Sequence, residues 1–273
     1  KVRRPYRMGR GLSPLLLIDE MGPVDYGPGE ALGAPWHPHR GFETVTYLLD
    51  GRMRHEDSAG NSGELNPGDV QWMTAGRGII HCEEPHQEFL KTGGRTHGFQ
   101  IWVNLPSSHK MMEPRYQEVP STESPIVEQD GVWARVIAGE CMGTTSSIDT
   151  KIPITLIHVK MKPESRLVQQ LQADLNGMIY VFNGEINLEN EIKVKKNPIA
   201  FGIGAKQVIQ DGELALLSEG DEIVIESQEG AEFLILAGPE LNEPIERYGP
   251  FVMNTKEEIH QAFLDYQNGT LAS

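Results

Sequence analysis

Three histidines and one glutamate occur in two short segments with a spacing that could bind a metal ion. His37 and His39 are separated by one residue, and so are His81 and Glu83. In an extended strand, side chains two residues apart point to the same face and lie roughly 7 Å apart, so both members of a pair can reach one ion. A single histidine on a strand is more often a hydrogen-bonded core residue, but two such pairs on facing strands would make a four-ligand site.

The types of these ligands narrow the choice of metal. Imidazole nitrogens suit iron and several other transition metals, and one carboxylate in a largely nitrogen site favours redox-capable divalent ions with open coordination positions. We therefore expect Fe²⁺, with manganese, nickel, copper or zinc as substitutes. Cys82 lies between His81 and Glu83, so its side chain should face the other side of the strand and should not touch the metal.

The elements that would position these ligands are strands. Short β-rich segments are separated by Gly, Pro, Asn and Asp throughout the chain, which predicts an all-β fold of barrels or sandwiches. The expected strands of a first barrel include residues 15–18, 44–49, 70–73 and 99–103. Asp50-Gly51 and residues 67–69 (Pro-Gly-Asp) should form turns between them.

A later part of the chain repeats this pattern, which indicates a duplicated barrel. The similar segments are residues 178–184 with 45–51, and residues 217–221 with 65–69. Residues 159–259 contain no histidine. The second barrel therefore cannot form a three-histidine site, and we expect it to serve packing, pocket closure or partner binding, with His158 in a structural role.

The resulting domain division is an N-terminal barrel with the metal site over residues 1–120, and a C-terminal barrel without metal over residues 131–273. The segment of about residues 110–130, rich in Pro, Glu and Ser, is expected to connect them. The second domain should end in a short helix, because Thr255 and Glu258 form a capping box. The residues at helical spacing behind this box are Ile259, Ala262, Phe263 and Tyr266.

Composition limits the location and the partners of the protein. With 24 Lys and Arg against 39 Asp and Glu, the net charge is −15, which disfavours direct binding to nucleic acid. No apolar run reaches the roughly 18 residues of a membrane span. Two cysteines suit a reducing compartment, and no signal-peptide pattern is visible, although the chain starts at Lys1 rather than Met. We expect a soluble protein of the cytoplasm, and also of the nucleus if the source is eukaryotic.

Several long motifs resemble the pirin family. They are residues 37–49 (HPHRGFETVTYLL), 55–58 (HEDS), 66–79 (NPGDVQWMTAGRGI) and 102–106 (WVNLP). The resemblance covers most of residues 11–120, and the remainder fits the family in general plan. It implies a bicupin, two tandem cupin β-barrels, with one non-haem iron in the N-terminal barrel. The family's iron ligands fall on His37, His39, His81 and Glu83.

The identity of the carboxylate ligand has an alternative. The general cupin pattern H-x-H-x(3,4)-E would select Glu43, whereas pirins use the glutamate two residues after the third histidine. We favour Glu83, because a strand places it beside His81 without the help of a turn. Glu43 would then be an inward-facing or core residue that hydrogen bonds and helps to orient the ligating imidazoles.

The resemblance also implies an activity, because pirins are similar to quercetin 2,3-dioxygenases. Such an enzyme cleaves a flavonol with O₂ and releases carbon monoxide. Four protein ligands would leave one or two positions free on a six-coordinate iron. Glu83 would both ligate the metal and take the proton of the substrate's 3-hydroxyl. Phe42, Trp72 and Phe99 are candidates to line an aromatic pocket, or else are ordinary core residues.

A rival interpretation belongs to a different class of protein. Pirins are also known as regulators that bind a transcription factor or a metabolic enzyme in a metal-dependent way, without turning over a substrate. This interpretation predicts the same metal ligands. A storage or sugar-isomerase type of cupin is disfavoured by the pirin-like run at residues 71–78.

Overall fold

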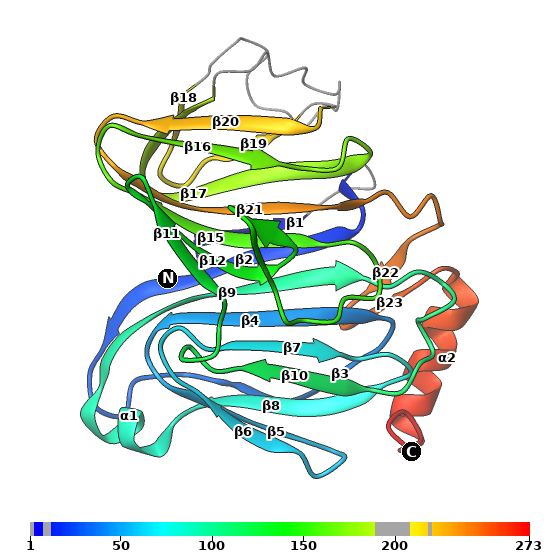
Figure 1. Cartoon of the computed structure of the whole chain (residues 1–273). Helices are drawn as coiled ribbons and strands as arrows, with labels where there is room; N and C mark the ends of the chain where they lie inside the picture. Colours follow the sequence, from blue (N-terminus) through cyan, green and yellow to red (C-terminus); the bar gives the residue numbers. More distant parts are fainter. Residues whose placement is uncertain (1–2, 8–11, 189–207, 218–219) are drawn as a thin grey trace. The chain divides into compact units, whose positions relative to one another are not determined.

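The computed structural model of the chain describes residues 3–7, 12–188, 208–217 and 220–273 (Figure 1). Strands dominate this part of the chain, and the two α-helices within it are α1 (Gln87–Thr92) and α2 (Lys256–Gln267). The prediction of a mostly β fold with a short C-terminal helix is therefore confirmed. The chain divides into two compact units.

The first unit contains β1 (Arg3–Arg7), residues 14–123 and residues 241–273. Its larger sheet has the strand order β1-β2-β9-β4-β7-β10, its smaller sheet has the order β3-β8-β5-β6, and β22 pairs with β23. The strand bounds are β2 Leu15–Tyr26, β3 Ala34–His39, β4 Phe42–Asp50, β5 Met53–Asp57, β6 Ser62–Leu65, β7 Val70–Thr74, β8 Ile79–Pro85, β9 Gly94–Asn104, β10 Arg115–Val119, β22 Glu246–Tyr248 and β23 Phe251–Met253.

The four strands predicted for the first barrel are confirmed as parts of β2, β4, β7 and β9. Strand β4 has an almost continuous apolar and threonine-rich sequence, and its residues 42–48 are buried. This pattern is expected of a central strand that is covered on both faces. Gly51 and Gly68 have φ values of 99° and 89°, so both predicted turns use the left-handed conformation that glycine adopts without a steric penalty.

The second unit contains Leu12, Ser13 and the described residues of 124–240. Its main sheet has the order β11-β12-β15-β21-β17-β20-β16, with β18 and β19 also paired to β17, and β13 pairs with β14. The strand bounds are β11 Ile126–Gln129, β12 Val132–Ala138, β13 Glu140–Cys141, β14 Thr144–Thr145, β15 Thr155–Met161, β16 Ser165–Gln170, β17 Leu175–Leu188, β18 Val208–Gln210, β19 Leu214–Leu216, β20 Glu222–Ser227 and β21 Ala231–Pro239.

The strand order supports the duplication that was inferred from the sequence. In the first unit β4 lies between β9 and β7, and in the second unit β17 lies between β21 and β20. These strands follow the same order along the chain in both units. The predicted similarity of residues 178–184 to 45–51 thus corresponds to β17 and β4. Residues 218–219 of the other repeated segment lie outside the described residues.

The structure divides the chain differently from the sequence-based scheme in two places. The segment 110–130, expected to be a connector, contains β10 and β11, which pair with β7 and β12 respectively. The C-terminal residues 241–273, expected in the second domain, belong to the first unit. Helix α2 packs there through a shared apolar cluster, whose members are Phe251, Met253, Ile259, Ala262 and Leu271, with Ile80 and Phe263 against them.

Helix α2 begins as predicted. Thr255 accepts a hydrogen bond from the Glu258 backbone amide, and the Glu258 side chain accepts one from the Thr255 amide, which completes the capping box. Of the four residues expected on its apolar face, Tyr266 is 39% exposed.

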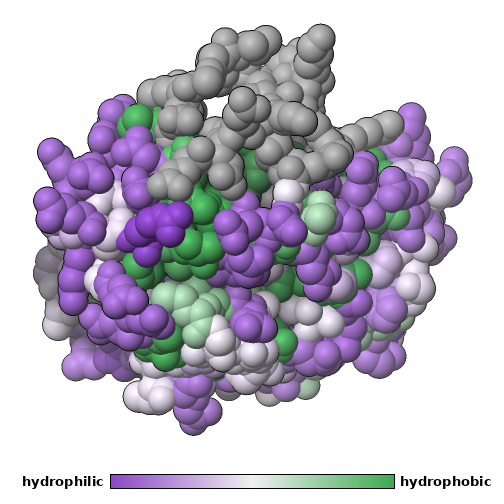
Figure 2. All heavy atoms as spheres, turned by 45° about the horizontal axis from the view of Figure 1, so that its top comes forward, coloured by the Kyte–Doolittle hydropathy of each residue, from purple (hydrophilic) through white to green (hydrophobic). Residues whose placement is uncertain are grey.

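No helix in the described ranges is long and apolar enough to cross a membrane. Hydrophilic residues predominate on the described part of the surface in Figure 2.

Candidate metal centre

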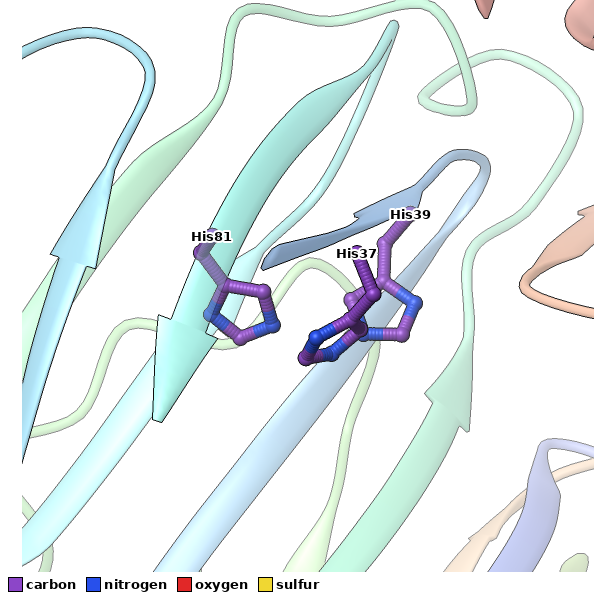
Figure 3. A group of neighbouring side chains, drawn as sticks. All are labelled: His37, His39 and His81. Atoms are coloured by element: carbon purple, nitrogen blue, oxygen red, sulfur yellow. The ribbon is translucent and has the colours of Figure 1, made fainter. Parts of the chain in front are cut away.

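Strand pairing brings the three predicted histidine ligands together. Strands β3 and β8 are antiparallel neighbours, with His37 directly opposite His81 and His39 opposite Ile79. His37 and His39 therefore share one face of β3, and His81 faces them from β8 (Figure 3). One nitrogen of each ring lies within 4.8 Å of the corresponding nitrogens of the other two. Three converging imidazoles at this separation could hold a single metal ion.

The hydrogen bonds of these rings leave nitrogens available for a metal. His37 Nδ1 donates to the Pro35 carbonyl at 2.8 Å, and His39 Nδ1 lies 3.4 Å from the Pro250 carbonyl. A backbone carbonyl on Nδ1 is the usual way to orient an imidazole so that Nε2 can ligate a metal. Neither ring nitrogen of His81 has a hydrogen-bond partner among the described residues, although the residue is only 1% exposed.

The protonation states of the two buried histidines also suit a metal. Burial, followed by the nearby His81 and His37 rings, holds the pKa of His39 well below its ordinary value. Burial lowers the pKa of His81 to about 4, although the Glu83 carboxylate opposes this shift. Both rings are therefore neutral at pH 7, which is the form that donates a lone pair to a metal. The donor set and the unpaired nitrogens of His81 thus fit a transition-metal ion.

Glu83 lies on the same face of β8 as His81, but its carboxylate is hydrogen-bonded to residues of the larger sheet. Its Oε1 accepts a hydrogen bond from the Thr46 hydroxyl at 3.1 Å, and its Oε2 accepts one from Gln100 Nε2 at 3.1 Å. The group of mutually close ligand atoms contains the three histidines and not Glu83. The structure therefore places this carboxylate beside the histidines, held by two donors, and its predicted role as a fourth ligand stays a prediction.

The alternative ligand Glu43 points away from the histidines. Side chains alternate along β4, so Glu43 and Thr46 lie on opposite faces, and Thr46 is the residue that contacts Glu83. The Glu43 carboxylate is fully buried and accepts a 2.6 Å hydrogen bond from the Thr74 hydroxyl. Glu43 is therefore a hydrogen-bonded core residue, and the expectation that it might face inward and orient the imidazoles is not met.

Only one of the three predicted aromatic residues lies beside the histidines. The Phe42 ring centroid is 5.2 Å from that of His39. Trp72 and Phe99 are cross-strand partners of Val45 and Tyr47, and so lie on the Glu43 face. The sequence reasoning missed Trp102, whose ring centroid lies 5.5 Å from that of His39 and 4.4 Å from that of Phe42. The alternation of side chains along a strand could have placed Trp102 on the same face as Gln100. It could not have shown that this face lies beside a metal site.

A polar row on the larger sheet was also missed. Cross-strand pairing places five polar residues side by side across β2, β9, β4, β7 and β10. In this order they are Asp19, Gln100, Thr46, Gln71 and Glu118. At one end, His55 Nε2 lies 2.6 Å from Glu118 Oε1, and Gln71 donates to the same oxygen. In the sequences of β2, β9, β4 and β7, the signal was a polar residue within a largely apolar stretch of the strand.

The lone histidine of the second unit has a structural setting, as predicted. His158 is completely buried on β15, with Nε2 2.9 Å from Glu232 Oε1 on the neighbouring β21. Burial lowers the pKa of His158 to about 4. Burial alone would raise the pKa of Glu232, but hydrogen bonds from His158 and Lys160 outweigh it and lower this pKa to about 2.

This pair predicts a loss of stability in acid. Between pH 6.5 and about 4 the unfolded chain protonates His158 whereas the folded chain does not, so the unfolding free energy should fall by roughly 2–3 kcal/mol as the pH drops. Below pH 4.5 the unfolded Glu232 protonates first and continues the trend. Urea titrations at pH 4 and 7 should show this loss of unfolding free energy. In the His158→Phe variant, the unfolding free energy should fall less between the same two pH values. An equal pH dependence of both proteins would contradict the assignment.

The fold and the site together define a class of protein. Two β units that share the order of three central strands, one of which presents three clustered histidines, are the features of a bicupin with one candidate metal site. The chain matches the family model of pirin over residues 1–103 and that of the pirin C-terminal cupin domain over residues 156–272. It is 42% identical to pirin of Homo sapiens over 262 residues, which are 95% of this chain and 83% of that protein. The chain therefore belongs to the pirin family.

Solved structures agree with this assignment. A crystal structure of quercetin 2,3-dioxygenase from Acinetobacter baumannii has a TM-score of 0.88 and 37% sequence identity, and the match covers 98% of this chain and 89% of that one. A bacterial pirin of Escherichia coli, solved in complex with nickel(II), has a TM-score of 0.61 at 21% identity, covering 84% of this chain and 83% of that one. The latter likeness is one of fold.

Proposed function

We propose that this chain is an iron-dependent dioxygenase of the quercetin 2,3-dioxygenase type, which opens the ring of a flavonol with O₂ and releases carbon monoxide. The observation that carries the proposal is the convergence of three imidazoles, two of them buried and neutral, beside the hydrogen-bonded carboxylate of Glu83. The name of the A. baumannii relative, at 37% identity, supports the same class of reaction.

His37, His39 and His81 would hold the metal, with Glu83 as the fourth ligand. Bound Fe²⁺ would supply Lewis acidity and the redox chemistry that the reaction with O₂ requires. His37 is the most exposed of the three histidines, since it is only partly buried. We therefore place substrate entry on the His37 side of the site.

Glu83 is the residue that would accept the proton of the flavonol 3-hydroxyl. Its carboxylate is held by Thr46 and Gln100, one donor on each oxygen. Two fixed donors set the orientation of the carboxylate and thereby place one oxygen for proton transfer. Phe42 and Trp102, which both contact the His39 ring, offer flat apolar surfaces of the kind that an aromatic ligand contacts.

The test uses the whole chain, stripped of metal and then loaded with Fe²⁺ under anaerobic conditions. Quercetin is added first and O₂ second. We expect the flavonol absorbance to disappear on addition of O₂, with about one carbon monoxide released per flavonol consumed. Protein loaded with Zn²⁺, which binds similar ligands but has no redox chemistry, is the matched control and should leave quercetin intact.

A stoichiometric Fe²⁺ complex that leaves quercetin unchanged would contradict the enzymatic proposal. It would favour the regulatory interpretation, in which the same ligands bind the metal but no substrate is turned over. Elemental analysis of protein isolated without added metal would identify the ion that the site selects, and a consistent content of zinc alone would argue against Fe²⁺.

A further inference from the structure

The C-terminal residues of the chain return to the strand that carries two of the metal ligands. Phe251 forms a parallel bridge with Arg40, the residue after His39, and the Val252 amide donates to the Arg40 carbonyl at 3.0 Å. Helix α2 follows this segment and packs on β22 and β23, as Figure 1 shows. The chain next to His39 is thus held by residues more than 200 positions later in the sequence.

Arg40 connects this region to α2 through its side chain. The Arg40 side chain is 5% exposed, and its Nη1 lies 2.7 Å from Asp265 Oδ2 on α2. Its Nε donates to the Arg77 carbonyl, in the turn before β8. The second oxygen of Asp265 accepts a hydrogen bond from Gln261 at 2.7 Å. Arg40 therefore links α2 to both of the chain segments that lead to the histidine ligands.

Lys110 forms a second link. Its buried ammonium donates to the Gly41 carbonyl at 2.8 Å, to Asn104 Oδ1 at 2.7 Å and to the Val252 carbonyl at 3.0 Å. Gly41 has a φ of 87°, and a Cβ atom at this position would collide with the Val252 carbonyl. The chain after His39 is therefore fixed by close backbone contact as well as by hydrogen bonds.

The C-terminal segment also reaches a ligand directly. The Pro250 carbonyl lies 3.4 Å from His39 Nδ1, which is long for a hydrogen bond but places an acceptor at the nitrogen opposite Nε2. Groups that contact the far side of a ligating imidazole set its orientation and its tautomer. The position of Pro250 depends in turn on the bridge at Phe251 and on the docking of α2.

We propose that residues 250–265, which we call the C-terminal clamp, are a positioning element of the metal centre. Pro250 orients His39, and the Arg40–Asp265 pair keeps the clamp docked. Metal binding and docking of α2 are consequently coupled, and the coupling acts in both directions, because linkage between two equilibria is reciprocal. The proposal rests on metal binding by His37, His39 and His81, and does not depend on flavonol turnover.

The first test is the Asp265→Asn variant of the full chain, which removes the charge opposite Arg40. Loss of a direct outer partner of a metal ligand costs about 10–100-fold in affinity, and Asp265 acts one contact further away, through Arg40. We therefore expect the affinity for Co²⁺, measured by competition with a chelator, to fall by about 10-fold, at the lower end of this range. The visible ligand-field spectrum of the Co²⁺ protein should change as well. Glu257→Gln removes the same charge from an exposed position of α2 and should alter neither quantity.

The second test needs no variant. Amide hydrogen exchange of residues 256–267 in the wild-type chain should slow when Co²⁺ or Zn²⁺ is bound, as reciprocity requires. Unchanged Co²⁺ affinity and an unchanged spectrum in folded Asp265→Asn would overturn the proposal. Exchange in α2 that is insensitive to metal would overturn it too, even if the variant did not fold. A failure of quercetin turnover would bear on the proposed function and would leave both of these readouts unaffected.

Discussion

Replacing His81 by alanine should leave the chain folded but unable to retain a metal ion. His81 is the proposed ligand from β8, and its ring faces His37 across the strand pair. Loss of an outer partner of a metal ligand already costs about 10–100-fold in affinity, so loss of a ligand itself should cost roughly 100-fold or more. Metal content after gel filtration, determined by elemental analysis, measures the effect directly.

The metal-free variant should be nearly as stable as the metal-free wild type. Both nitrogens of His81 are buried without a hydrogen-bond partner among the described residues. Burying an unsatisfied polar group costs about 1–3 kcal/mol. Removing the His81 ring removes this cost, which offsets part of the stability lost with the packing of the ring. The main difference should appear on adding metal. Metal at 100 times its Kd should stabilise the wild type by about 2.7 kcal/mol and the variant much less.

His55→Gln is the matched control for this prediction. His55 is buried in the same barrel, but its ring contacts Glu118 and lies outside the group of three histidines. A glutamine amide can still donate to Glu118, so the variant should fold and should retain the metal. Full metal content in His81→Ala, or loss of metal in His55→Gln alone, would contradict the assignment of the ligands.

Under the proposed function, replacing Glu83 by glutamine should abolish most of the rate of flavonol cleavage while part of the metal remains bound. The three histidines stay in place, but an amide cannot accept the proton of the substrate hydroxyl. Removal of a general base typically lowers the rate by about 10²–10⁴-fold. Single-turnover loss of quercetin absorbance by the Fe²⁺ protein, normalised to its measured metal content, separates this effect from metal loss.

Glu43→Gln is the matched control for Glu83→Gln. Both carboxylates are buried in the first unit, but Glu43 lies on the opposite face of β4 and accepts a hydrogen bond from Thr74. The control should keep its rate within a few-fold of the wild type. Equal losses in both variants would show that the effect is not specific to Glu83, and would remove the argument for Glu83 as a base.

The sequence determined the parts of this protein that depend on local spacing. Alternation along a strand is a property of each strand alone, so the spacing by itself assigns His37 with His39, and His81 with Glu83, to common faces. The four strands predicted for the first barrel and the capping box at Thr255 follow from local propensities in the same way.

Only the tertiary structure decided how these parts meet. The face of β4 that carries Thr46, rather than Glu43, turns toward Glu83, and Trp72 and Phe99 fall on the other face. Periodicity shows that a strand has two faces but does not say which one lines the site, since that choice depends on how distant strands pair.

The C-terminal segment is the other part that local sequence could not assign. Arg40 and Asp265 are 225 residues apart in the chain, and the order of elements suggested that α2 would follow the second barrel. The helix instead buries Ile259 and Ala262 in the first unit, and its Asp265 pairs with Arg40, the residue after His39. Burial of an apolar face is a property of the whole folded chain, because any sufficiently apolar surface can satisfy it.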